Sequence, residues 1–140
     1  MTGSSWVGMV AVPKPGPGQT ITESRSFVSH CSDVETLVTL TTEAGLSSWL
    51  GQVTSFDVRR GGDIVFADGY RGSYSMIDLP RHIVLLTERH GEISLIVQPR
   101  AKPIEVRMTI TRFVPDGDDP DGIRSLLRST IDSLEARLHV

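Results

Sequence analysis

Short runs of alternating apolar and polar residues fill the region from Val53 to Val114. The clearest run is Ile104–Arg112, where apolar residues mostly occupy the even positions and polar residues the odd ones. That period of two is typical of a strand with one face on a core and the other in water. Turn sequences such as Arg60–Asp63 and Asp68-Gly69 separate consecutive runs. We therefore predict an antiparallel meander, with strands at Val53–Arg59, Asp63–Ala67, Tyr70–Met76, His82–Arg89, Glu92–Gln98 and Ile104–Arg112.

A long amphipathic helix is predicted after the meander. Asp119 can cap it, and Pro120 can occupy its first turn, where the missing N–H costs nothing. Its apolar residues recur at helical spacing and should face the sheet; they are Ile123, Leu126, Leu127, Ile131, Leu134 and Leu138. The charged residues expected in water are Arg124, Arg128, Asp132 and Glu135. Arg128 and Asp132 are expected to form an ion pair along the helix.

Three elements are predicted ahead of the meander. Thr20–Val28 is rich in β-branched and aromatic residues and indicates a strand. Ser32 followed by Glu35 is a capping box, which predicts the start of a short helix. The spacing i, i+3, i+4 predicts that this helix buries Val34, Leu37 and Val38. A second short helix is expected to carry Leu46, Trp49 and Leu50 and to end at Gly51.

The predicted order is therefore one strand, two short helices, six strands and one long helix. The fold class is α+β, and a curved antiparallel sheet wrapped around the long C-terminal helix accounts for this order. Residues 1–19 are expected to form a flexible Pro/Gly-rich tail that carries the apolar segment Trp6–Val12. Residues 20–140 are expected to form a single domain.

Composition excludes several classes of function. The 140 residues carry a net charge of −3, without the basic excess typical of a dedicated nucleic-acid binder. The single cysteine, Cys31, excludes an intrachain disulfide and a multi-cysteine zinc site, and the four histidines lack metal-ligand spacing. We expect no metal and no cofactor. Without a signal peptide or an apolar run of about 20 residues, we expect a cytoplasmic protein that does not insert into membranes.

The inward faces of these elements supply candidate cavity residues. The last strand, the aromatic strands and the long helix would present them toward a common interior, where a small hydrophobic molecule could bind. Tyr70 and Gly72 are expected to share the face of Tyr74. The candidates are Trp49, Phe56, Phe66, Tyr74, Met76, Leu85, Val106, Met108, Ile110, Leu127, Ile131 and Leu134. Because protein interiors are close-packed, the alternative is that these side chains form a dry core.

Signals for catalysis are poor. The sequence has no nucleophile elbow, phosphate-binding loop or HExxH motif, and its Ser, His and Asp residues follow no triad order. The acid–base candidates near the predicted cavity include Tyr74 and Asp57, and Cys31 precedes a predicted helix start. We assign no catalytic residue.

Three segments resemble a known superfamily. Leu46–Gly51 is similar to its short helix ending in tryptophan and glycine, and Val58–Asp63 to its Gly-Gly hairpin. Gly72–Leu85 resembles its glycine, strand, proline turn and following strand. Over about residues 20–138 the chain resembles the helix-grip superfamily of START-like and birch-pollen-allergen-like domains (SRPBCC), in particular homologues of the activator of the heat-shock protein 90 ATPase.

The resemblance implies a helix-grip fold with a cavity between the sheet and the C-terminal helix. It also implies non-enzymatic binding, transport or sensing of a small hydrophobic ligand, such as a lipid or a polyketide-like molecule. Some members act as protein-binding adaptors, so a co-chaperone-like interaction protein is the alternative, with Trp6–Val12 and Asp116–Asp121 as its contacts. A cyclase or hydrolase that uses the same cavity is a third hypothesis.

Overall fold

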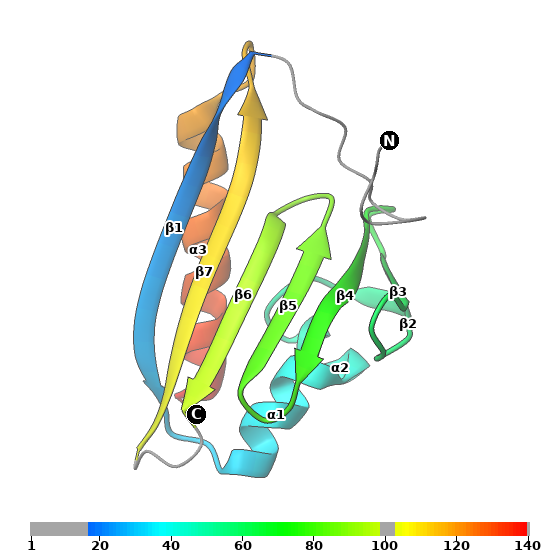
Figure 1. The fold of residues 1–140 in the computed structure, drawn as a ribbon, viewed down its shortest axis with the longest axis vertical. Coiled ribbons are helices and arrows are strands. Elements are labelled where there is room, and N and C mark those ends of the chain that lie inside the picture. The colour runs from blue at the N-terminus through cyan, green and yellow to red at the C-terminus, as the bar shows by residue number, and fades with distance from the viewer. Residues whose placement is uncertain (1–16, 99–102, 140) are drawn as a thin grey trace.

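A computed structural model describes residues 17–98 and 103–139. Its seven strands form one antiparallel sheet in the order β1-β7-β6-β5-β4-β3-β2 (Figure 1). The strands are β1 (Gly18–Ser29), β2 (Val53–Phe56), β3 (Asp63–Phe66), β4 (Arg71–Asp78), β5 (His82–Thr87), β6 (Gly91–Gln98) and β7 (Ile104–Pro115). The helices are α1 (Asp33–Thr41), α2 (Glu43–Ser47) and α3 (Pro120–Leu138). The predicted α+β class and element order are confirmed.

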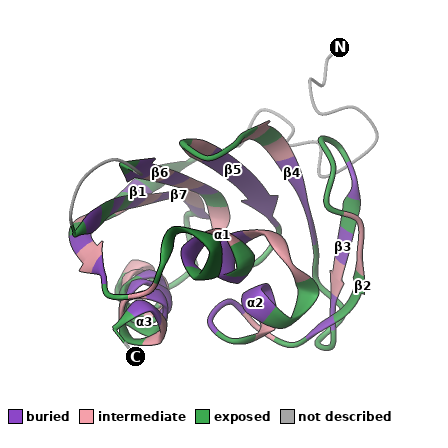
Figure 2. Cartoon of the chain, turned by 90° about the horizontal axis from the view of Figure 1, so that it is seen from below, coloured by how far each residue is buried: buried purple, intermediate pink, exposed green. Residues whose placement is uncertain are grey.

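The sheet curves over the three helices, which lie on its concave side (Figure 2). Consecutive strands β2 to β7 are neighbours, as a meander requires, and β1 pairs with β7 along its whole length, from Gly18↔Pro115 to Ser29↔Ile104. β1 begins at Gly18, two residues before Thr20, where the sequence predicts the start of the first strand. The predicted tail segment Trp6–Val12 lies outside the described residues.

Helix α3 begins and packs as its sequence predicts. The side chain of Asp119 accepts a hydrogen bond from the backbone N–H of Asp121 at 3.1 Å, and Pro120 occupies the first turn. The apolar side of the helix is buried against the sheet through Leu127, Ile131, Leu134 and Leu138. Burial of this side supplies the main stabilisation of the helix.

The charged residues of α3 behave differently from the prediction, because they reach β1 instead of one another. Glu23 accepts hydrogen bonds from Arg124 at 2.7 Å and Arg128 at 2.9 Å. The hydrogen bonds from Arg128 and Arg124 hold the pKa of Glu23 below its usual range. Arg25 donates to Glu135 at 3.0 Å and also to Asp132. Both partners of the predicted Arg128–Asp132 pair are thus engaged with β1, and Arg124 and Glu135 are half-buried rather than in water.

The buried side of α1 was predicted wrongly. The capping box of Ser32 and Glu35 is present, but Val34 and Val38 are 69% and 45% exposed. The buried residues are instead Thr36, Thr39 and Leu40. Their polar groups have hydrogen-bond partners: the Thr36 hydroxyl lies 2.8 Å from that of Ser29, Thr39 Oγ1 donates to the carbonyl oxygen of Glu35, and the Thr39 carbonyl accepts from the Trp49 indole at 3.0 Å. Satisfied threonines therefore cost little to bury.

A bulge in β4 overturns the predicted face of Met76. Tyr74 pairs with Leu85 and Met76 pairs with Val84, so one extra residue, Ser75, lies between the two pairs. The extra residue moves Met76 to the opposite face from Tyr74. Met76 is 42% exposed, whereas Tyr74 is fully buried.

Candidate functional site

The residues predicted to line a sheet–helix cavity are brought together in the core. Ten of them are buried in one hydrophobic cluster, and Phe56 packs against it half-buried. The ten are Trp49, Phe66, Tyr74, Leu85, Val106, Met108, Ile110, Leu127, Ile131 and Leu134. Met76, by contrast, is outside the cluster. Ligand binding between these side chains stays a prediction.

The predicted acid–base candidates are engaged elsewhere. The Tyr74 hydroxyl donates a hydrogen bond to the Leu40 carbonyl at 2.8 Å, and burial raises the pKa of this phenol far above its usual value. Asp57 accepts a hydrogen bond from Arg59 at 2.8 Å at the exposed hairpin. A bonded, fully protonated tyrosine and an exposed carboxylate do not form a catalytic pair.

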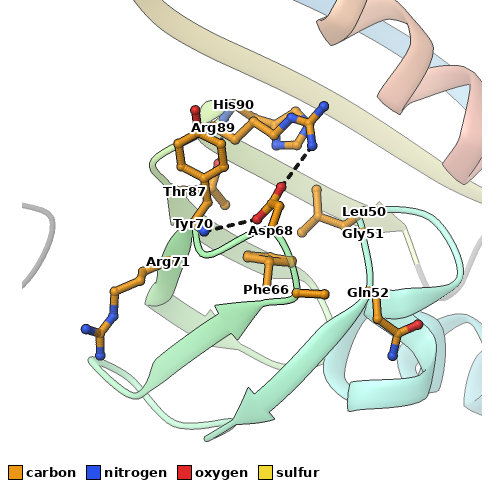
Figure 3. A pocket seen from close by; sticks show the side chains of 11 residues that line it. Leu50, Gly51, Gln52, Phe66, Asp68, Tyr70, Arg71, Thr87, Arg89 and His90 are labelled. Carbon is orange, nitrogen blue, oxygen red and sulfur yellow. Dashed lines mark hydrogen bonds and ion pairs between the residues drawn. The ribbon is translucent and has the colours of Figure 1, made fainter.

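A separate hollow lies at the end of the sheet where the β3–β4 and β5–β6 turns approach the segment after α2 (Figure 3). Its volume is about 180 Å³. We call it the His90 hollow. It is lined by Leu50, Gly51, Gln52, Phe66, Ala67, Asp68, Tyr70, Arg71, Thr87, Arg89 and His90. Phe66 is the one residue of the predicted cavity set that lines it.

The inner wall of the His90 hollow is apolar and fixed by the core. Leu50 and Phe66 are 7% and 8% exposed and belong to the hydrophobic cluster. Leu50 lies in the turn after α2. Its own backbone N–H donates to the Leu46 carbonyl at 2.8 Å, which fixes its position. Phe66 ends β3, where it pairs with Val53. The wall therefore consists of side chains that cannot move without disturbing the core.

The rim of the hollow is held by one carboxylate. Asp68 accepts a hydrogen bond from the backbone N–H of Tyr70 and an ion-paired hydrogen bond from Arg89, both at 3.0 Å (Figure 3). The first contact closes the turn between β3 and β4, and the second ties that turn to the turn between β5 and β6. Asp68 thereby keeps the two sides of the opening together.

His90 and Thr87 are the two buried polar residues of this wall. His90 is 4% exposed, and its backbone N–H donates to Thr87 Oγ1 at 3.0 Å. Burial, followed by the charges of Arg89 and Arg112, lowers the pKa of His90 to about 4. Neither ring nitrogen forms a hydrogen bond with another residue of the described ranges. At neutral pH the hollow is therefore lined by an uncharged imidazole with one free donor and one free acceptor.

The substitution His90→Asn should weaken the dependence of stability on pH. In the wild type the unfolded histidine takes up a proton near pH 6.5, whereas the folded one does so only near pH 4. Stability is therefore lost as the pH falls through this window, by about 2 kcal/mol between pH 7 and pH 5. Urea unfolding of both proteins at the two pH values measures the difference. Equal losses in both would show that His90 is not buried as a neutral ring.

A second hollow of about 240 Å³ lies between α1, the β4–β5 turn and the ends of β6 and β7. It is lined by Asp33, Thr36, Leu37, Pro80, Val97 and Ile104. Its buried polar side chain, Thr36, already shares a hydrogen bond with Ser29. It therefore offers a ligand no buried polar group in need of a partner, unlike the His90 hollow.

Sequence reasoning missed the His90 hollow because its walls come from turns. The sequence pattern at Asp68-Gly69 indicates only a turn, and His90 lies between two predicted strands. The available signal was a histidine and an aspartate in two turns of the predicted meander. Alternate turns of a meander lie at the same end of its strands, so these two residues are expected near each other.

Within the described ranges, no helix is long and apolar enough to cross a membrane. The same ranges contain no cluster of three or more histidine, cysteine, aspartate or glutamate residues able to hold a metal ion.

The chain matches no protein-family model, and no curated protein matches its sequence. Solved structures do match its fold. The solution structure of the Aha1 dimer from Colwellia psychrerythraea is 17% identical with a TM-score of 0.65, and the match covers 87% of this chain and 97% of that one. The AHSA1-like protein from Aeromonas hydrophila is 11% identical with a TM-score of 0.60, covering 83% and 90%. CalU16 from Micromonospora echinospora is 12% identical with a TM-score of 0.59, covering 86% and 76%.

The TM-scores show that the fold is shared, and at identities of 11–17% the matches show the fold alone. The match extends over more than four fifths of the chain in each case. The chain therefore has the helix-grip fold of the Aha1-like structures.

Proposed function

We propose that this protein binds a small, mainly apolar molecule in the His90 hollow, without catalysing a reaction. The observation that carries the proposal is the composition of the hollow: an apolar wall of Leu50 and Phe66, and the His90 imidazole, which bonds no residue of the described ranges, in a space of about 180 Å³. Mostly apolar walls with a few placed polar groups are typical of small-molecule sites.

The volume of the His90 hollow limits the size of the ligand. An apolar cavity of about 150 Å³ holds a benzene molecule, and this hollow measures about 180 Å³. Sites for drug-sized molecules are larger, roughly 300–1,000 Å³. A single aromatic ring or a short branched chain therefore fits, whereas a long-chain lipid would have to extend outside the hollow.

The expected affinity follows from this size. Six to eight non-hydrogen atoms placed against Leu50 and Phe66 bury only a small apolar area. Each Å² of buried apolar area contributes about 25 cal/mol to the binding free energy. After the cost of association, a dissociation constant on the order of 0.1–1 mM is expected for a plain aromatic ring. Tighter binding needs polar contacts with His90.

Filling the hollow should abolish binding. Ala67 lines the hollow, so Ala67→Phe places a ring inside it; Ala136 is exposed on α3, so Ala136→Phe is a matched control. Calorimetric titration with toluene, phenol and indole should show that the first variant binds at least tenfold more weakly than the wild type and that the control binds equally well. Equal affinity in both variants, or no binding by the wild type, would refute the proposal.

A second candidate function is self-association through α1. Val34 and Val38 on this helix and Leu79 on the neighbouring β4–β5 turn are all more than two fifths exposed. The groove lined by Leu37 and Pro80 shows that the helix and this turn lie side by side. Exposed apolar surface of this kind is typical of an interaction site. The Colwellia protein is a dimer in solution, and we propose a second copy of this chain as the partner.

Sedimentation of Val34→Asp tests the second candidate. Val58 is also 45% exposed but lies in the connection between β2 and β3, so Val58→Asp is the control. We expect the wild type and the control to dimerise and Val34→Asp to be monomeric. A monomeric wild type at several hundred micromolar would contradict self-association.

A further inference from the structure

The polar side chains that line the His90 hollow differ in whether they already have partners. Asp68 accepts a hydrogen bond from Arg89 at 3.0 Å. The Thr87 hydroxyl donates to the carbonyl oxygen of Gly91 at 3.2 Å and accepts from the backbone N–H of His90. By contrast, neither ring nitrogen of His90 bonds a residue of the described ranges. The imidazole is therefore the buried polar group of the hollow that a ligand can satisfy.

The ring nitrogens of His90 are also within reach of a molecule in the hollow. Among the buried and half-buried residues of the described ranges, the side-chain nitrogen or oxygen that is fully enclosed without a partner is Nη1 of Arg112. The unpartnered nitrogens of His90 are not enclosed in this way, although the residue as a whole is buried. Because His90 lines the hollow, its accessible ring edge is open to a molecule bound there.

The charged side chains that line the hollow are already paired. Asp68 and Arg89 neutralise each other across the opening, and Arg71 lies at the exposed rim, where it contacts Asp63 at 3.4 Å. Burial lowers the pKa of His90 to about 4, so its ring is neutral at pH 7. An ionised ligand would therefore lose its hydration without gaining a free counter-charge, and an uncharged ligand is favoured.

From this arrangement we infer that the His90 hollow selects an uncharged ring that carries a hydroxyl group, as a phenol does. The ring lies against Leu50 and Phe66, and the hydroxyl shares a hydrogen bond with the imidazole. A neutral imidazole has a donor at one nitrogen and an acceptor at the other, and a hydroxyl fits either because it both donates and accepts. The inference rests on the proposed function and specifies the class of ligand.

The size of the hollow agrees with a single small polar group on the ring. A benzene molecule occupies a cavity of about 150 Å³, and one water has a share of about 30 Å³ in the liquid. The volume of about 180 Å³ therefore holds one ring and a group of the size of a hydroxyl. Without that hydroxyl, a bound ring displaces water from the imidazole and leaves it unpaired, which lowers affinity.

A ligand series on the unaltered protein tests the inference without any mutation. Phenol, toluene and benzoate share one ring and differ in the attached group. Calorimetry or amide chemical shifts at pH 7 should give phenol at least fivefold higher affinity than toluene, with benzoate the weakest. Phenol binding no tighter than toluene, or benzoate binding tighter than phenol, would overturn the inference and leave the proposed function standing. Failure of every compound would overturn both.

Two histidine variants assign the selection to one residue. His90→Leu should remove the preference, so that toluene binds at least as tightly as phenol. His82 lies on β5, outside the lining residues, and shares a hydrogen bond with Ser94 at 3.0 Å, so His82→Leu should retain the preference for phenol. An unchanged preference in His90→Leu would contradict the role of His90. If His90→Leu does not fold, the ligand series on the wild type still decides the inference.

Discussion

Replacing Leu134 with alanine is expected to lower the free energy of unfolding by about 2–5 kcal/mol. Leu134 is fully buried on the inner side of α3, within the cluster that joins the helix to the sheet. The truncation removes apolar contacts and leaves a cavity between two elements that the ion pairs of Glu23 and Arg25 hold in place. Because these elements cannot close the gap freely, the upper part of the range is expected. Urea unfolding measures the change.

Ser133→Ala is the control for this prediction. Ser133 is the preceding residue of α3 and is exposed, with its hydroxyl donating to the Ser129 carbonyl at 3.0 Å. Its removal should change stability by less than about 0.5 kcal/mol. Similar small losses in both variants would mean that the inner side of α3 does not carry the packing described here.

Gly45→Ala is expected to destabilise the protein by about 3 kcal/mol, although alanine favours helices over glycine by about 1 kcal/mol. A Cβ atom at Gly45 would collide with the backbone of α1: it would lie 2.7 Å from the Thr39 Cα atom and closer still to the Val38 carbonyl oxygen. Backbone cannot yield as a side chain can, so α1 and α2 would have to separate. Thermal unfolding should show a clear decrease in melting temperature.

Gly122→Ala provides the comparison for Gly45. Gly122 lies in the first turn of α3, where a Cβ atom would meet only side-chain atoms of Asp119. That side chain can shift, so the variant should stay within about 1 kcal/mol of the wild type. A Gly45→Ala protein as stable as this one would show that α1 and α2 are not in close contact.

The order of the elements and the packing of α3 could be predicted because each depends on local rules. Alternation in Ile104–Arg112 and the Asp119-Pro120 start of α3 act within a few residues of sequence. The capping box at Ser32 correctly predicted where α1 begins. These signals do not depend on which other segment packs against the element.

The buried face of α1 and the face of Met76 could not be predicted from the same rules. The apolar spacing of Val34 and Val38 indicates a buried face, but Thr36 and Thr39 face the core instead. The Thr36 hydroxyl pairs with that of Ser29 on β1, and the Thr39 hydroxyl bonds within α1, so both are satisfied when buried. The bulge at Ser75 reverses the alternation after Tyr74. Both outcomes depend on tertiary partners that periodicity does not encode.

The candidate site was harder to predict than the fold for a related reason. Ten of the apolar residues expected to line a cavity lie together in the core, and ligand binding between them stays a prediction. The His90 hollow arises where two turns and the segment after α2 meet, and its polar groups include those of Asp68, Arg89 and His90. Single residues in turns carry no periodic signal, so their proximity emerges only from the three-dimensional structure.

The most direct test of binding in the His90 hollow is a titration of the isotope-labelled protein with toluene, followed through its backbone amide resonances. The account predicts concentration-dependent shifts at Phe66, Tyr70 and Thr87, which line the hollow. It predicts no comparable shifts at Met108 and Ile131, which lie between the sheet and α3. Shifts confined to Met108 and Ile131, or the absence of shifts at saturating toluene, would contradict it.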